Sequence, residues 1–228
     1  MTTAKQLQDL LGLRTSPVGI TFQPSPPANV PRVSAAGPAG CSYWKRASEG
    51  QSFYTEAPDH YNCPIGAYTH GVDLPPAQAK ELEGVVGTMI GLGYLRAEEV
   101  AGIPRRQEKF GVAVYAPLSA SPGTPDVVMI RGNARQMMLL SEAAQAAGIG
   151  SDAGLMGRPT CAMIPQVLQS TKSAASLGCI GNRVYNQLGD DEFYFALPGK
   201  QVGPVVEKLS TIVNANRELE KYHQAKLK

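Results

Sequence analysis

The sequence lacks any run of roughly 18–20 apolar residues, the length that a helix needs to cross a bilayer. Residues 1–6 lead into an amphipathic pattern and not into the apolar core of a signal peptide. From these two absences we expect a protein that is neither inserted into a membrane nor exported, and that stays in the cytoplasm.

Charge is also sparse. Charged residues make up 18% of the chain, the net charge is +2, and the basic residues do not gather in a block. A nucleic-acid groove needs a concentrated positive stripe, so the sequence argues against a nucleic-acid partner. No internal repeat and no low-complexity segment is present. Hydrophobic residues make up 43% of the 228 positions, which is typical of a globular chain that builds one core, and we expect a single domain over residues 1–228.

Strand and helix patterns alternate along the chain. Helical spacing of apolar residues, or a proline suited to a first turn, predicts helices at residues 3–11, after Pro75 and Pro76, after Asn133 and from about residue 202. Short runs rich in β-branched and apolar residues predict strands at 16–23, 111–118, 126–130 and 193–197. This order favours a mixed α/β (α+β) fold, in which helices pack on a mixed sheet and long Gly/Pro-rich loops carry the cysteines.

The four cysteines form no Cys-x-x-Cys pair, which is the strongest sequence signature of a zinc ribbon or a ferredoxin. Their spacing is Cys41-x21-Cys63 and Cys161-x17-Cys179. Each lies next to or near a glycine or a proline, and at least three lie in polar, glycine-containing turns. A cysteine that only fills a core belongs in an apolar strand or helix. The context therefore favours ligation over simple burial.

Cytosolic thiols are kept reduced, so four cysteines there are more often metal ligands or reactive groups than disulfides. The ligands would span most of the chain, whereas structural zinc usually joins closely paired ligands. A domain of this size also needs no zinc to fold. We therefore expect a [4Fe-4S] cluster on Cys41, Cys63, Cys161 and Cys179. It would serve electron transfer or small-molecule redox chemistry, with a redox protein or a small molecule as partner.

Three alternatives remain open at this stage. The first is a zinc-stabilised binding module, and the second is a thiol–disulfide redox protein. The third is non-catalytic binding of a small anion or cofactor at the helix start near Asn133, where Arg131 and Arg135 add positive charge. In the cluster hypothesis Arg131, Arg135 or Arg183 would balance the charge of the thiolates. Whether the protein is an enzyme, and its oligomeric state, are left undecided by the sequence.

Three histidines occur, and two of them, His60 and His70, flank Cys63. These two could join a mixed site with the cysteines, although a lone histidine is more often a core or surface residue. His223 belongs to the terminal helical pattern, and we expect it to face solvent.

Several segments together resemble a known family. They are SPVGI at 16–20, MIRGNARQM at 129–137, LGCIGNR at 177–183, DDEF at 190–193 and LPG at 197–199. The chain resembles the family called domain of unknown function 169 from about residue 5 to residue 220. The resemblance implies a prokaryotic cytosolic protein of no settled activity. It also implies that the four cysteines belong to the family's pattern, and that Arg183 and Glu192 are secondary candidates for the surroundings of the site.

Overall fold

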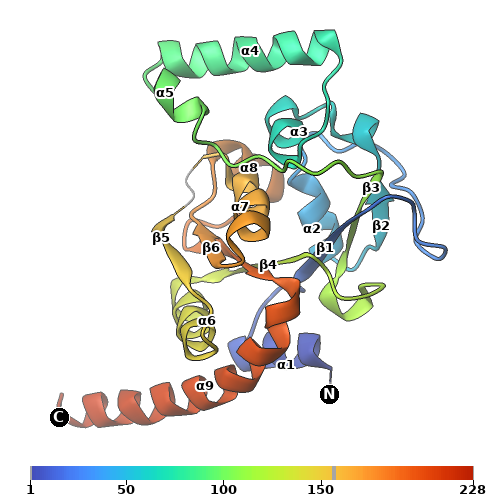
Figure 1. The fold of residues 1–228 in the computed structure, drawn as a ribbon. Coiled ribbons are helices and arrows are strands. Elements are labelled where there is room, and N and C mark those ends of the chain that lie inside the picture. The colour runs from blue at the N-terminus through green and yellow to red at the C-terminus, as the bar shows by residue number, and fades with distance from the viewer. Residues whose placement is uncertain (1, 156–157, 228) are drawn as a thin grey trace.

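The computed structural model describes residues 2–155 and 158–227 and is organised around one sheet (Figure 1). Its strands are β1 (Val18–Gln23), β2 (Phe53–Thr55), β3 (Val112–Pro117), β4 (Val127–Asn133), β5 (Ser151–Leu155), β6 (Ser173–Ser176) and β7 (Glu192–Pro198). The seven strands follow the order β2-β3-β1-β4-β7-β6-β5. Neighbours run antiparallel except for the parallel pair β5–β6. The expected mixed α/β class is confirmed.

The α-helices are α1 (Thr3–Leu11), α2 (Ser42–Ser48), α3 (Pro64–His70), α4 (Pro76–Gly91), α5 (Ala97–Val100), α6 (Ala134–Ala146), α7 (Met163–Ser170), α8 (Ile180–Asn186) and α9 (Val202–Ala225). Single 3-10 turns are η1 (Ala57–His60), η2 (Leu118–Ala120), η3 (Thr160–Ala162) and η4 (Gly199–Gln201). The helices cover both faces of the sheet, and α4 and α5 lie apart from it as an arm at the top of Figure 1.

The two faces of the sheet carry different cores because side chains alternate along each strand. In β4, Val128 and Ile130 lie in a cluster with α1, α6 and α9, which we call the α9 face. Val127 and Met129 lie in the opposite cluster. That cluster also contains Cys161, with Cys41 packed against it, and we call it the cysteine face.

Glycine and asparagine end or begin helices where the sequence predicts them to. Gly12 adopts φ 64° and ends α1, because a left-handed residue lets the chain leave a helix without strain. Asn133 begins α6, and its side chain accepts a hydrogen bond from the Gln136 backbone N–H at 3.0 Å. Both predictions are confirmed.

The Gly/Pro-rich stretch from 24 to 50 around Cys41, one of the loops expected to carry the cysteines, is only partly irregular. It contains α2, and the stretches around Cys63 and Cys179 contain α3 and α8. Each of these three helices has seven residues, two turns, which is too short for an apolar period to stand out from the glycines and prolines around it.

Candidate functional site

Three of the four cysteines occupy the residue immediately before a short helix. Cys41 precedes α2, Cys63 precedes α3 and Cys179 precedes α8. The fourth, Cys161, lies in η3 directly ahead of α7. Two of these segments connect strands of the β1–β2–β3 half of the sheet, and two connect strands of the β5–β6–β7 half.

None of the three cap-position thiols makes a capping hydrogen bond. Helix caps are normally serine, threonine, aspartate or asparagine, whose oxygen accepts a backbone N–H. At the start of α6 the Asn133 side chain accepts such a hydrogen bond from the Gln136 backbone N–H. The side chains of these three cysteines therefore do not cap the helices that follow them.

Two of the four thiols, those of Cys41 and Cys161, have pKa values shifted by burial and by neighbouring cysteines. Burial, together with smaller contributions from the neighbouring thiols of Cys63 and Cys179, raises the pKa of Cys41 to about 12. Burial also raises the pKa of Cys161, and the other three cysteines add to that rise. Other thiols, and not lysine or arginine side chains, are the ionisable groups that act on these two. All four are free cysteines.

The described part of the chain contains no group of three or more His, Cys, Asp or Glu side chains placed to hold a metal ion. The cysteines therefore lie within electrostatic reach of each other without forming such a group. Metal or cluster binding stays a prediction for Cys41, Cys63, Cys161 and Cys179.

Two threonines connect the cysteine segments. The Thr160 hydroxyl accepts a hydrogen bond from the Cys179 backbone N–H at 2.6 Å, which joins η3 to the start of α8. The Thr69 hydroxyl lies beside the Cys161 thiol and lowers its pKa by a hydrogen bond, against the larger effect of burial. These contacts hold α3, η3 and α8 together around the sulfurs.

Glycine lets two cysteine segments approach closely. A Cβ atom on Gly66 would lie 2.9 Å from the Cys63 Sγ and 3.8 Å from the Gly40 Cα. A side chain at Gly66 would therefore fill space that the thiol occupies. Gly178, just before Cys179, has φ 82°, and a Cβ there would lie 2.4 Å from the Leu188 side chain.

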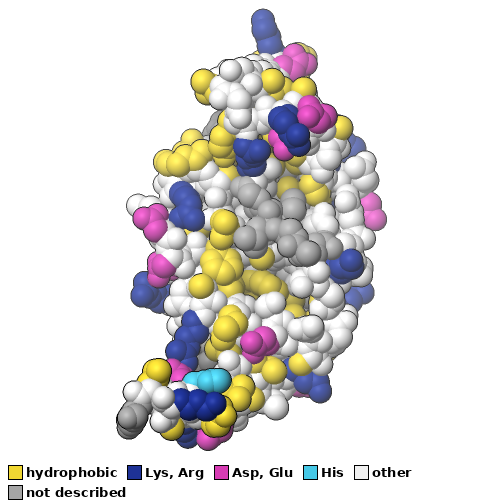
Figure 2. Space-filling view, turned by 90° about the vertical axis from the view of Figure 1, so that its left-hand side faces the viewer, with side chains coloured by type: hydrophobic (Ala, Val, Ile, Leu, Met, Phe, Trp, Pro, Cys, Tyr) yellow, Lys and Arg dark blue, Asp and Glu magenta, His cyan; other side chains and the backbone are white. Residues whose placement is uncertain are grey.

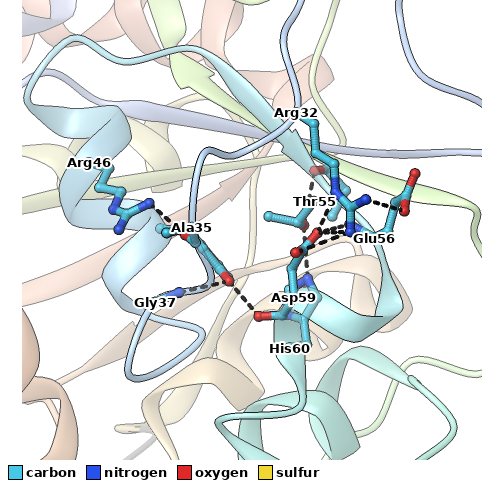
Figure 3. A network of polar contacts seen from close by, with 10 residues as sticks. Arg32, Ala35, Gly37, Arg46, Thr55, Glu56, Asp59 and His60 are labelled. Atoms are coloured by element: carbon cyan, nitrogen blue, oxygen red, sulfur yellow. Dashed lines mark hydrogen bonds and ion pairs between the residues drawn. The ribbon is translucent and has the colours of Figure 1, made fainter.

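A polar network fixes the turn that leads to Cys63 (Figure 3). The Tyr43 hydroxyl donates to the Asp59 carbonyl at 2.5 Å and accepts from the Gly37 backbone N–H at 3.1 Å. Arg32 pairs with Asp59 at 3.3 Å. The segment ahead of Cys41 and the turn ahead of Cys63 are thus joined through one buried tyrosine.

His60 and His70 are fully buried beside this turn, with ring centroids 5.4 Å apart. Burial lowers the pKa of His60 to about 3 and that of His70 to about 4, so both rings are neutral at neutral pH. The Nδ1 atom of His70 lies 2.7 Å from the Gly66 carbonyl, which can only accept, so Nδ1 carries the proton. Its Nε2 atom has no hydrogen-bond partner.

Buried polar atoms without partners gather near the cysteines. Most of the nitrogen and oxygen atoms of this kind among the described residues belong to side chains on the cysteine-bearing segments or the neighbouring strand: Trp44, His60, His70, Tyr115, Asn182 and Asn186. Buried polar atoms are normally paired, so a cluster of exceptions calls for a specific explanation. Residue type alone does not predict this cluster, because asparagine and tryptophan also occur in ordinary cores and on surfaces.

The arginines predicted to balance charge have protein partners. Arg131 forms an ion pair with Glu192 and donates to the carbonyls of Asn186 and Gln187. Arg135 pairs with Glu220 at 2.5 Å. With the Asn133 side chain engaged in its cap, the helix start offers an arrangement of satisfied groups, and anion binding there stays an untested expectation.

Arg183 lies on α8 and holds the turn around Cys179. It donates to the Leu177 carbonyl at 2.6 Å and to the Gly189 carbonyl at 3.0 Å. Glu192, the other secondary candidate, accepts from the Gly189 backbone N–H at 2.9 Å as well as pairing with Arg131. Both residues support the backbone on which Cys179 and α8 are placed.

Comparison with known proteins identifies the family of this chain. The sequence matches the family of domain of unknown function 169, described as "Uncharacterised ArCR", over residues 6–208. The chain belongs to this family. The match includes all four cysteines and ends within α9, so the candidate site lies inside the domain of unknown function 169.

An uncharacterized protein of Methanocaldococcus jannaschii is 27% identical to this member of the family over 159 residues, which cover 66% of this chain and 67% of that protein. No solved structure matches the chain. The comparisons therefore give the family without an activity.

The surface adds two observations. Among the described residues, no helix has the length and apolar character needed to span a membrane. Lys and Arg side chains are spread over the face shown in Figure 2, with Asp and Glu side chains among them.

Proposed function

We propose that Cys41, Cys63, Cys161 and Cys179 together bind an iron–sulfur cluster of the [4Fe-4S] type, and that the protein serves electron transfer or small-molecule redox chemistry. The observation that carries the proposal is the convergence of four free cysteines from four separate segments, since Cys63 and Cys179 raise the pKa of Cys41 and these three cysteines raise the pKa of Cys161.

Charge supports a metal-containing occupant. Four thiolates at close range repel one another, and the groups that shift the pKa of Cys41 and Cys161 include no protein cation. A bound metal deprotonates its thiol ligands and supplies the missing positive charge. Iron ions would therefore balance the charge of these thiolates, whereas Arg131 and Arg135 are paired with Glu192 and Glu220.

The raised pKa values count against the thiol–disulfide alternative. Thiol–disulfide exchange needs a thiolate as nucleophile. A Cys41 thiol with a pKa of about 12 is almost fully protonated at neutral pH. All four cysteines are also free of disulfides. A zinc-stabilised module is the other metal-binding alternative, and the composition of the bound metal separates it from the cluster.

The test is the content of iron, zinc and acid-labile sulfide in protein purified without oxygen. We expect iron and sulfide in about equal amounts and broad absorption near roughly 400 nm, which is typical of thiolate-bound clusters. Single substitutions C41S, C63S, C161S and C179S should each lower the iron content. The exposed Met138 on α6 gives the control M138S, which should leave it unchanged.

A content of one zinc ion per chain, without iron, would favour the zinc-stabilised module over the cluster. Metal-free protein, whose cysteines pair on mild oxidation and separate on reduction, would support the thiol–disulfide alternative. Iron content that survives all four cysteine substitutions would reject the site itself.

A further inference from the structure

A cavity of about 470 Å³ opens to solvent where α1 and α9 begin. These two helix starts lie at the bottom of Figure 1, whereas α2, α3 and α8, which follow three of the cysteines, lie above them. None of the four cysteines lines the cavity. Its volume is within the range of roughly 300–1,000 Å³ that is typical of small-molecule sites. The cavity therefore has room for more than a single ion.

The walls of the cavity are fixed by the fold. They come from η2, the turn before β4, the first residues of α1 and the continuous helical segment formed by η4 and α9. The Gly199 backbone N–H donates to the Asp126 carbonyl at 3.0 Å, and the Leu118 N–H donates to the Pro17 carbonyl at 2.8 Å. A side chain at Gly199 would collide with the Pro125 carbonyl, so η4 packs directly on the turn. The cavity is preformed.

Hydrogen-bond donors line this cavity, and none of the described residues in its walls is acidic. The hydroxyls of Thr3, Ser119 and Thr124 come from three different segments. The Thr3 backbone N–H belongs to the first turn of α1, where N–H groups have no acceptor within the helix. Asp126 follows the turn directly, but it is not part of the walls, and its carboxylate accepts from the Phe22 N–H at 2.7 Å. Donors without a carboxylate among them suit an anion.

Lys200 adds a positive charge to the walls. Its side chain is exposed, and it forms no ion pair with any acidic side chain among the described residues. A lysine ammonium binds phosphate as a point charge, whereas planar carboxylates are matched better by the fork of an arginine. A phosphate group also has three acceptor oxygens, which suits donors from several segments. Lys200 therefore favours a phosphate group over a carboxylate.

Gly203 leaves part of the cavity open. A Cβ atom at this position would meet nothing within 4 Å, and the backbone is not in the left-handed region. Neither packing nor conformation requires a glycine here, and glycine is unfavourable in a helix compared with alanine. The buried Val202 and the half-buried Leu118 line the same cavity and provide apolar surface. The space beside Gly203 can therefore hold the organic part of a ligand.

We propose that this cavity binds a small organic phosphate. The phosphate group lies at Lys200 and the hydroxyls of Ser119 and Thr124, and the organic part lies against Leu118 and Val202. Binding involves no chemical step. The site is separate from the cysteines, so the proposal does not depend on an iron–sulfur cluster.

Isothermal titration calorimetry of the full chain at constant ionic strength tests the site. The probes are phenyl phosphate and benzoate, a carboxylate with the same ring. Phenyl phosphate should bind saturably, and about tenfold more tightly than benzoate. K200A should weaken its binding by about tenfold or more, because a charge-assisted hydrogen bond is lost. G203L should abolish binding, since the leucine has room to extend into the cavity.

Two matched variants serve as controls. K208A removes an exposed lysine of α9 that does not line the cavity, and G84L adds a leucine on α4, where a Cβ also meets nothing within 4 Å. Both should bind phenyl phosphate as the wild type does. If circular dichroism shows that G203L is not folded, T124V takes its place, because valine keeps the shape of threonine and removes one hydroxyl of the site. T124V should weaken binding.

The proposal is overturned by a wild-type protein that does not bind phenyl phosphate saturably. Benzoate bound as tightly as phenyl phosphate would overturn the assignment to phosphate. Unchanged affinity in folded K200A and G203L, or in K200A and T124V, would place the bound phosphate elsewhere on the surface. An equal loss in K200A and K208A would also reject the cavity, since it would reflect the overall charge of the protein.

Discussion

The cores on the two faces of the sheet differ in the side chains that they contain. The α9 face packs aliphatic side chains of α1, α6 and α9, with Met137 and Phe195, against β4 and β7. The cysteine face contains Tyr43, Trp44, Tyr115, Tyr194 and Cys161, and polar atoms without partners lie next to it. A core of the first kind stabilises the fold by burial alone. A core of the second kind leaves polar atoms unpaired, which directs the search for function to the cysteine face.

The largest effect should come from a cavity on the α9 face. Leu209 of α9 is fully buried there, and L209A should lower the free energy of unfolding by about 2–5 kcal/mol. Urea denaturation measures the loss. The iron content of the folded variant should equal that of the wild type, because α9 packs on the face opposite the thiols. A large loss of iron in folded L209A would show that the two faces are not independent.

Lowering the pH should destabilise the protein through the two buried histidines beside the cysteine face. Histidines in the unfolded chain titrate near about pH 6.5, whereas burial holds the pKa of His60 at about 3 and that of His70 at about 4. Between these values the unfolded chain binds more protons than the folded one. Stability is therefore full above about pH 6.5 and falls by up to about 1.4 kcal/mol per pH unit for each histidine as the pH decreases towards 4.

Urea denaturation of metal-free protein at pH 7 and pH 5 measures this slope. The double variant H60Q/H70N removes both titrations, and its asparagine can still donate to the Gly66 carbonyl as His70 does. It should lose most of the pH dependence, while H223Q on the exposed end of α9 should keep it. An unchanged slope in H60Q/H70N would place the acid sensitivity elsewhere.

A substitution at Gly66 tests how tightly the Cys63 thiol is packed. G66A would place a Cβ 2.9 Å from the Cys63 Sγ, so overpacking should cost about 1–3 kcal/mol, partly offset by about 1 kcal/mol of helix propensity. Iron content should fall because the thiol is displaced. The control is G84A in α4, where a Cβ meets nothing within 4 Å, and there stability should rise by up to about 1 kcal/mol. Full iron content in G66A would contradict a role for this close approach.

The smallest expected effect is the difference in stability loss between substitutions at two helix-cap positions, Asn133 and Cys179. N133A removes a capping hydrogen bond on α6 and should cost about 1 kcal/mol in thermal or urea denaturation. C179A in metal-free protein removes a side chain that makes no capping bond, and it should cost clearly less. Equal losses would mean that Cys179 does contribute to the helix start, and the argument from the caps would then fail.

The sequence predicted the long, regular elements because their apolar periods extend over many residues. The starts of α6 and α9, the end of α1 at Gly12 and the strand before Asn133 were all found in this way. The short helices α2, α3 and α8 were missed. In α8 the reason is physical, since Asn182 and Asn186 face inwards and an apolar period points to the wrong face.

The candidate site was likewise predicted only in part from the sequence. The cysteines were found from residue type and from their place beside glycine and proline, which needs no knowledge of packing. The pairing of Arg131 with Glu192 and of Arg135 with Glu220 joins residues 61 and 85 positions apart, so only the fold reveals that these arginines already have partners. Asn182 carried no signal, because an asparagine becomes informative only when it is seen to be buried and unpaired.

The order of the strands has a consequence for how a finished protein is made. Cys41 and Cys63 belong to the connections of β1, β2 and β3, while Cys161 and Cys179 belong to those of β5, β6 and β7. The pairing of β4 with β7 joins these two halves of the sheet. If the proposed cluster binds, its delivery would follow synthesis beyond residue 198, the end of β7, and any factor that supplies it would meet a chain that is already folded.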